Sequence, residues 1–578
     1  MVATTTQISS PKPAKSPLSI AFKLEQWERL EPIYEELVQR TVRNVKDLEQ
    51  WILDRNEVSA MVEEEFGWRY IKFTTNANDK AAAKRYEYYI QYISPNISKY
   101  DFRLNQKLVE SPFLNELDFR TYQIYARSIR NAVELFEESN IKRNAQERLL
   151  AKQYGAIMAS IEVEIDGKPY TLQQTGALLE QTNRSEREKV FIKANQALLN
   201  HREEIDDIYD QLISVRQEIA KAANFDNYRD YKFQELGRFD YKPEDCIAFQ
   251  DSIKEEILPL LTDVHERKKR GLHLQNLRPW DLAVDEKHDE PLRPFRSVDD
   301  LVAKAVKALS AVNPYFGECI QKMQEEEHLD LKARRGKRPG GYNMPLPVKG
   351  VPFIFMNVSS SVVDMRTFMH ESGHAVHSFL TNEQDLITAK HPPSEIAELA
   401  AMSMELLSMD KWHYFFSSEA ELKRAKIWLL ENILQLLPWI AIIDRFQHWI
   451  YANPHHDKAE RREKWLEILN DFSTPTMNRE GLEEIVAHSW HRQLHLFEVP
   501  FYYIEYGMAQ LGAIAIWKNY KEKGQAAVED YIKALKMGYS RPIKEVYAAA
   551  GISFDFSKAY VKELAQFLKG EIAALLEE

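Results

Sequence analysis

The sequence is poor in cysteine, glycine and proline. Cys246 and Cys319 are the only cysteines among 578 residues, which excludes a disulfide scaffold and a cysteine-rich zinc module and favours a reducing compartment. The 19 glycines and 24 prolines make up about 7% of the chain, compared with about 12% in average proteins. With 28% charged and 44% hydrophobic residues, the chain is expected to be a globular protein built mostly of helices.

A net positive charge, a signal sequence and an unbroken apolar segment are also lacking. The net charge of −12 argues against a nucleic-acid partner. Residues 1–17 contain no apolar stretch and are expected to form a disordered tail rather than a secretion signal. The most apolar segment, Ile427 to Ile443, is predicted to be a buried helix pair rather than a membrane span. Four residues interrupt it: Glu431, Asn432, Gln435 and Pro438. We therefore expect a cytoplasmic protein without a membrane contact; the sequence identifies no partner protein.

Apolar residues at helical spacing dominate most of the chain, and only two segments predict strands. Alternating apolar residues before Asp166-Gly167 indicate a β-hairpin near residues 161–172. Residues Phe353 to Asn357 are predicted to form a short strand, for which Pro352 indicates a boundary or a sheet edge. The basic loop Lys332 to Arg338 is expected to be solvated or, alternatively, to neutralise acidic groups or the C-terminus of a substrate.

The motif H-E-x-x-H at residues 370–374 carries the clearest chemistry. If Asp364 caps a helix there, His370 and His374 lie one turn apart on one face and can bind the same metal ion. Glu371 then lies beside the ion, where a base can hold a metal-bound water. Gly373, in the middle of this helix, suggests that another element packs closely against its backbone. On the motif alone, a helix with two solvated or core histidines remains an alternative.

A catalytic zinc site needs a third protein ligand. His377 is about 10.5 Å from His370 along the helix axis, too far to share one ion. The segment HPPSEIAELAAMSMELL offers a second helix, with Ser394 as its expected cap. Glu398 and Glu405 share one stripe of this apolar helix, so we assign Glu398 as the ligand and Glu405 as the acceptor that orients a ligand histidine. The alternative is a solvated acidic face.

A late segment, HRQLHLFEVPFYYIEYGMAQLGA, is rich in histidine and tyrosine. Neutral donors of these types can stabilise the oxyanion of amide hydrolysis. Tyr502 and Tyr506 are one turn apart if the segment is helical. Core packing is the alternative for all of these rings, which are His491, His495, Tyr502, Tyr503 and Tyr506.

Together these segments resemble the oligoendopeptidase F branch of the thimet oligopeptidase family of zinc peptidases. The resemblance covers most of the chain after about residue 160. It is carried by HESGHAVH, EIAELAAMSMELL, the late histidine and tyrosine segment, DGKPYTLQQTGALLEQTNRSEREKVF, NYRDYKFQELGRFDYKPEDC and RRGKRPGGY. It implies a predominantly all-α fold, a two-lobed helical ellipsoid with a deep substrate channel. The same resemblance implies one zinc ion (Zn2+) per chain and a small β element near the zinc site.

The resemblance also assigns roles to residues. It makes His370, His374 and Glu398 the zinc ligands, and Glu371 the general base that activates a zinc-bound water and later donates the proton. His495, Tyr502 and Tyr506 match the groups that stabilise the transition state. The family pattern has a glycine-rich run before its tyrosine, whereas this chain has Glu498-Val-Pro-Phe501. The register of the donors therefore stays open, and His491 remains a candidate.

We therefore expect a zinc metalloendopeptidase of the gluzincin type that cuts internal bonds of short unfolded peptides. Phe353, Phe355 and Tyr503 are candidate substrate-binding residues, because the strand from Phe353 could pair with an extended peptide. The expected organisation is the tail 1–17, an N-terminal helical lobe 18–200 and a catalytic domain 201–578. Two alternatives remain: a zinc carboxypeptidase or dipeptidyl carboxypeptidase of related fold, and an inactive peptide-binding protein with a structural zinc.

Overall fold

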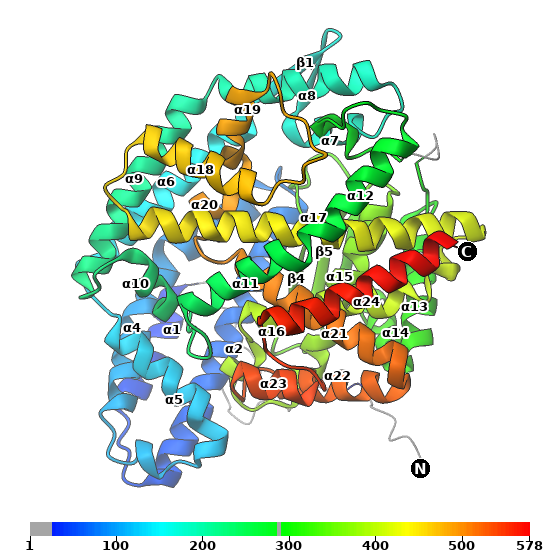
Figure 1. Ribbon diagram of the computed structural model, residues 1–578. Coiled ribbons are helices and arrows are strands. Elements are labelled where there is room, and N and C mark those ends of the chain that lie inside the picture. Colours follow the sequence, from blue (N-terminus) through cyan, green and yellow to red (C-terminus); the bar gives the residue numbers. More distant parts are fainter. Residues whose placement is uncertain (1–7, 9–25, 286–290, 578) are drawn as a thin grey trace. The chain divides into compact units, whose positions relative to one another are not determined.

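The protein is predominantly helical, as the sequence predicts. The structure, a computed structural model, describes residues 8, 26–285 and 291–577 (Figure 1). The predicted tail 1–17 lies outside the described residues except for residue 8. Internal contacts divide the chain into two compact units of three segments each. Unit 1 is Met1–Leu135, Leu292–Ala425 and Gly512–Phe554, and unit 2 is Phe136–Pro291, Lys426–Leu511 and Asp555–Glu578. This division differs from the predicted boundary at residue 200, because periodicity does not report which distant segments pack together.

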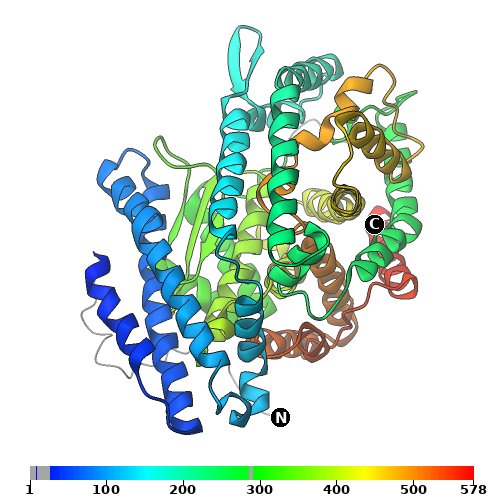
Figure 2. The same cartoon turned by 90° about the vertical axis from the view of Figure 1, so that its left-hand side faces the viewer.

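Unit 1 contains the helices that surround the H-E-x-x-H motif. Its helices are α1 (Trp27–Gln39), α2 (Val45–Thr75), α3 (Lys80–Tyr88), α4 (Ser94–Val109), α5 (Phe119–Glu134), α13 (Val298–Val312), α14 (Pro314–Glu325), α15 (Val362–Leu380), α16 (Ser394–Met409), α22 (Gln525–Met537) and α23 (Ile543–Ala549). The blue helices in Figure 2, α1, α2 and α4 among them, share one core. Trp51 and Leu104 are fully buried in it.

The sheet of unit 1 consists of β3 (Leu329–Lys332), β4 (Tyr342–Met344) and β5 (Phe353–Val358). Its order is β3-β5-β4, with β3 parallel and β4 antiparallel to β5. The predicted strand is therefore present and begins directly after Pro352, which marks its boundary. It is the middle strand of the sheet and not an edge. Phe353 and Phe355 pack against Ile71 of α2, beside which the green strands lie in Figure 2.

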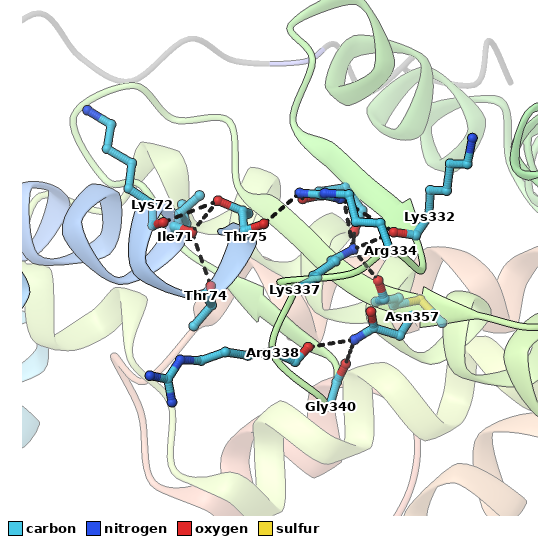
Figure 3. A network of polar contacts seen from close by, with 12 residues as sticks. Ile71, Lys72, Thr74, Thr75, Lys332, Arg334, Lys337, Arg338, Gly340 and Asn357 are labelled. Atoms are coloured by element: carbon cyan, nitrogen blue, oxygen red, sulfur yellow. Dashed lines mark hydrogen bonds and ion pairs between the residues drawn. The ribbon is translucent and has the colours of Figure 1, made fainter. Parts of the chain in front are cut away.

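The basic loop that follows β3 closes the C-terminal end of α2, as Figure 3 shows. The Arg334 guanidinium donates to the carbonyl of Thr75 over 2.8 Å, and the Arg338 amide donates to the carbonyl of Thr74 over 3.0 Å. The last carbonyls of a helix lack partners within the helix and carry partial negative charge. The loop therefore caps α2.

The positively charged side chains of this loop bind other groups of the same chain. Arg334 binds Asp330 with both Nη atoms, over 2.5 and 2.7 Å, and the Lys337 ammonium lies 3.0 Å from the same carboxylate. Arg338 stacks its guanidinium 3.8 Å from the centre of the Phe73 ring. Three of the cations thus stabilise the loop itself, which weakens the prediction that the loop neutralises a substrate.

Unit 2 is also mainly helical. Its helices are α6 (Asn140–Ser160), α7 (Leu172–Leu178), α8 (Arg184–Leu199), α9 (Arg202–Ala222), α10 (Tyr228–Glu235), α11 (Pro243–Glu256), α12 (Leu258–Gly271), α18 (Lys458–Asp471), α19 (Glu483–Ala487), α20 (Leu494–Glu498) and α24 (Lys558–Glu577). Helices α17 (Glu419–Ala452) and α21 (Ile504–Lys523) contribute to both units. In Figure 1, α24 lies alongside α11, which it contacts.

The predicted hairpin forms in unit 2. Strand β1 (Glu162–Ile165) pairs antiparallel with β2 (Lys168–Thr171). Asp166 and Gly167, which join them, have φ values of 53° and 74°. A two-residue turn with positive φ at both positions matches the twist of a hairpin, which explains why Asp-Gly stands there.

The apolar segment predicted as a helix pair is part of one helix. Helix α17 is 34 residues long and includes Pro438. The predicted interruption of the helix at this proline is therefore wrong. A proline removes one backbone hydrogen bond, and the buried packing on both sides of it offsets that loss. By length and composition alone α17 could cross a membrane, but 61% of its most apolar window is buried inside the protein. That burial is typical of a core helix.

Candidate metal centre

Helix α15, which carries the H-E-x-x-H motif, begins at Val362. Its N-cap is Ser361, whose hydroxyl accepts a hydrogen bond from the Asp364 amide over 3.1 Å. The Asp364 carboxylate accepts in return from the Ser361 amide over 2.9 Å. This capping box places Asp364 in the first turn of the helix, so the prediction that Asp364 is the cap was wrong by three residues.

Helix α16 supplies the carboxylate that meets the two histidines. Its N-cap is Pro393, without a side-chain hydrogen bond, and Ser394 is its first residue. The expectation that Ser394 caps this helix was therefore wrong. Glu398 lies one turn further on and is 6% exposed.

His370, His374 and Glu398 converge on one point. The Glu398 Oε2 atom lies 3.3 Å from His370 Nε2 and 3.9 Å from His374 Nε2. The two imidazole rings are perpendicular, with centroids 4.9 Å apart. One ligand atom from each residue lies within 4.8 Å of the others. The structure thus brings together all three residues that the sequence assigned to a metal.

The chemistry of this group fits a divalent metal ion. Glu398 Oε2 is buried and has no hydrogen-bond partner in the described part of the chain, an arrangement that is costly unless a cation is bound. Burial lowers the pKa of His374 to about 4, so its imidazole is neutral near pH 7 and has a lone pair to offer. Two imidazoles and one carboxylate are a ligand set of catalytic zinc sites.

Close packing of α15 against α16 makes this convergence possible. A Cβ added to Gly373 would lie 2.6 Å from Ala401 Cα and 2.7 Å from the Ala400 carbonyl. Real Cβ atoms do not approach so closely, so only glycine fits. The prediction of close backbone packing at Gly373 is confirmed.

Glu405 fixes the orientation of His370. Its Oε1 atom lies 2.7 Å from His370 Nδ1, so Nδ1 donates to Glu405 and Nε2 is the nitrogen that faces Glu398. Although burial acts in the opposite direction, the interactions with Glu398 and Glu405 raise the pKa of His370 well above its ordinary value. Sequence reasoning missed Arg366, whose Nε lies 3.7 Å from Glu405 Oε2. Its position one turn before His370 was the available signal.

Glu371 has the environment of a general base. It is 7% exposed, and its Oε2 atom has no hydrogen-bond partner among the described residues. Burial raises the pKa of Glu371 to about 7. A base whose pKa lies near the working pH combines availability with proton affinity.

The predicted histidine and tyrosine donors form an aromatic group in unit 2. The His495 ring lies 6.2 Å from Tyr502, 4.5 Å from Tyr503 and 6.1 Å from Tyr506 between centroids. Tyr502 and Tyr506 are 5.3 Å apart. Helix α21 begins at Ile504, so only Tyr506 is helical, and the i,i+4 geometry expected for the two tyrosines does not occur.

A hydrogen-bond chain sets the tautomer of His495. The Trp439 indole donates to Gln493 Oε1 over 3.0 Å, which fixes the orientation of that amide. The Gln493 nitrogen then donates to His495 Nδ1 over 2.7 Å, so the ring proton is on Nε2. Burial lowers the pKa of His495 to about 4, and the ring is a neutral donor near pH 7. Sequence reasoning missed both partners, although Gln493 stands only two residues before His495.

Three other candidate residues are parts of the core. His491 is 0% exposed, and its Nε2 lies 3.2 Å from Asp206 Oδ1. Phe353 and Phe355 are 6% and 1% exposed, and their strand is paired on both sides. The prediction that this strand pairs with an extended peptide is therefore wrong, because β3 and β4 occupy both sides of β5 along these residues.

Comparisons with known proteins identify the family of the chain. The family described as Peptidase family M3 matches residues 177–566, and the Peptidase M3 N-terminal domain matches residues 19–136. An oligoendopeptidase F homolog of Borreliella burgdorferi is 23% identical over 476 residues, which is 78% of this chain and 76% of that protein.

Solved structures show the same fold. A structure of PZ peptidase A with inhibitor 2 has a TM-score of 0.87 and 25% identity, covering 96% of this chain and 99% of that one. A putative oligoendopeptidase F also has a TM-score of 0.87 and 25% identity, with 96% and 98% covered. The chain is therefore a peptidase that belongs to peptidase family M3, in its oligoendopeptidase F branch.

Proposed function

We propose that this peptidase is a zinc-dependent endopeptidase that hydrolyses internal bonds of short unfolded peptides. The observation that carries the proposal is the convergence of His370 Nε2, His374 Nε2 and Glu398 Oε2, with a buried carboxylate oxygen that lacks a hydrogen bond. When bound by these three side chains, zinc acidifies water and polarises a carbonyl group.

Glu371 is the proposed general base. Its buried carboxylate, with a pKa of about 7, accepts a proton from the attacking water and then gives it to the leaving amine. A purely structural metal site has no use for such a base. For that reason hydrolysis is favoured over the alternative of an inactive peptide-binding protein.

The aromatic group of unit 2 is proposed to stabilise the transition state. Its donors are the Nε2 proton of His495 and the hydroxyls of Tyr502 and Tyr506. Neutral, preorganised donors stabilise an oxyanion without first having to be desolvated as charges. Tyr503 is proposed to contact the substrate side chain through its ring.

In this proposal the substrate peptide pairs with β4 and not with β5. Strand β4 is at an edge of the sheet, and both β4 and β5 contact α15. Main-chain hydrogen bonds to an edge strand bind an extended peptide without demanding a particular sequence. The expected substrates are therefore short peptides of varied sequence, and a cytoplasmic location remains a prediction.

Purified protein with zinc and a mixed peptide pool tests the proposal, with cuts mapped by mass spectrometry. The wild type should cut internal bonds, including those of peptides with an amidated C-terminus. Glu371→Ala should retain zinc and lose activity by ~10²-fold or more. Val363→Ala, an exposed change in the first turn of the same helix, is the control and should be fully active.

Other outcomes would point to the alternatives. Release of one or two residues from free C-termini only, with amidated peptides left intact, would indicate a carboxypeptidase or dipeptidyl carboxypeptidase. Stoichiometric peptide binding without any product would indicate a binding protein. Full turnover in Glu371→Ala, with contamination excluded, would refute the role of that residue.

A further inference from the structure

A second group of metal-binding side chains lies in the core of unit 2. Cys246 of α11 meets Asp444 and His448 of α17, and one ligand atom from each lies within 4.8 Å of the others. Asp444 and His448 are one turn apart on α17. Cys246 and Asp444 are 0% exposed, and His448 is 5% exposed. The group shares no residue with the candidate metal centre, which lies in unit 1.

This group contains buried polar atoms without hydrogen bonds. Both ring nitrogens of His448 and the Oδ1 atom of Asp444 form no hydrogen bond in the described part of the chain, and the charged contact of His448 Nε2 is with Asp444 Oδ2. The rings of Phe233 and Phe501 flank His448, with centroids 5.8 and 5.4 Å away. Buried carboxylate and imidazole atoms without hydrogen bonds are costly, and a bound ion is one of the few arrangements that satisfies them.

A neighbouring amide holds the carboxylate in place. Arg445 Nε donates to Gln250 Oε1 over 2.9 Å, which turns the amide nitrogen of Gln250 toward Asp444. That nitrogen donates to Asp444 Oδ2 over 2.6 Å. Gln250 therefore acts as a positioning residue for the carboxylate, in the way that hydrogen-bond donors hold the ligands of known metal sites.

We propose that Cys246, Asp444 and His448 bind a divalent cation that accepts a thiolate ligand, zinc above all, and that this ion joins α11 to α17. A thiolate and a carboxylate balance the two positive charges, and the neutral imidazole completes the set. His448 Nε2 lies 3.2 Å from Asp444 Oδ2, close to the ~3.3 Å that separates two ligands each ~2.0 Å from a tetrahedral ion. With no solvent access at Cys246 or Asp444, the ion has a structural role.

The sulfur ligand gives this site a signature that the His370, His374 and Glu398 group does not have. Zinc X-ray absorption of the wild-type holoprotein should show a sulfur neighbour at ~2.3 Å. Protein produced with cobalt in place of zinc should show a thiolate-to-cobalt charge-transfer band in the near ultraviolet. Both should persist in His370→Ala/His374→Ala, so that failure of the proposed catalytic site and failure of this one are distinguishable.

Matched cysteine variants complete the test. Cys246→Ser should lose the charge-transfer band and one metal equivalent per chain, whereas Cys319→Ser, at an equally buried cysteine of α14, should lose neither. If Cys246→Ser does not fold, the wild-type absorption spectrum alone decides. Absence of sulfur around zinc and of the cobalt band in the wild type would overturn the proposal and leave an Asp444–His448 ion pair without metal.

Discussion

Gly373 of α15 touches Ala401 of α16 so closely that a Cβ added to Gly373 would lie 2.6 Å from Ala401 Cα. This contact sets the distance between the helix of the two histidines and the helix of Glu398. Gly373→Ala should therefore separate the helices, destabilise the protein by ~1–3 kcal/mol and weaken metal binding. Denaturant unfolding and metal analysis measure the two effects.

Gly570→Ala is the matched control for that variant. Gly570 lies in α24, and a Cβ there would meet no atom within 4 Å. Alanine should stabilise this helix by ~0.5–1 kcal/mol. If Gly373→Ala were as stable as Gly570→Ala and bound metal normally, close packing at Gly373 would not position the ligands.

Glu405→Gln tests the orientation of His370. The amide can still contact Nδ1, but it removes the negative charge that stabilises the bound imidazole. Loss of such a partner typically costs 10–100-fold in metal affinity, which competition with a chelator measures. Unchanged affinity would show that Glu405 has no part in metal binding, whatever the effect on folding.

Substitutions in the aromatic group should separate catalysis from metal binding. Tyr502→Phe and Tyr506→Phe each remove one donor, and loss of one oxyanion donor costs ~10²–10³-fold in kcat. Tyr503→Phe keeps its ring and should change kcat little. All three should bind zinc as the wild type does. Equal activity of all three variants and the wild type would exclude the tyrosine hydroxyls from the reaction.

Protonation of the Asp281 carboxylate is expected to destabilise the protein in acid. This carboxylate, 0% exposed, pairs with Arg184 over 2.9 Å and with Arg187 over 3.0 Å. Burial alone would raise the pKa of Asp281, but hydrogen bonds from Arg184, the Arg278 amide and Arg187 hold it below its ordinary value. The stabilisation is therefore complete above the unfolded pKa of ~3.9 and is lost as pH falls through the lower folded value.

Asp281→Asn should cost ~3–5 kcal/mol at neutral pH, because it leaves the buried guanidinium group of Arg187 without its charge partner. The difference from the wild type in free energy of unfolding should shrink as pH falls below ~4. Asp263→Asn, at an exposed position of α12, should show neither effect. A difference for Asp281→Asn that is independent of pH would contradict the account.

The sequence was most informative where chemistry follows local spacing. The i,i+4 spacing of His370 and His374 and the apolar stripe that carries Glu398 need only helix geometry to predict a shared ligand face. The Asp166-Gly167 turn likewise follows from backbone preferences alone. Helix starts were predicted less well, because Ser361 and Asp364 are both capping residue types, and because α16 starts after Pro393 without a side-chain cap.

Relationships between distant segments could not be predicted. The middle position of β5 depends on β3 and β4, and its residues carry no mark of a partner on each side. Cys246 and the Asp444–His448 pair lie in helices that are far apart in the sequence, so their meeting appears only in the folded chain. The continuity of α17 through Pro438 depends on tertiary packing, which overrides the local preference for a break.

Anomalous diffraction at the zinc absorption edge, from crystals of the wild-type protein, tests the central claim most directly. The account predicts a peak within bonding distance, ~2.0–2.2 Å, of His370 Nε2, His374 Nε2 and a carboxylate oxygen of Glu398. A zinc-loaded crystal without a peak between these three side chains, or with the Glu398 carboxylate turned away from the ion, would contradict it.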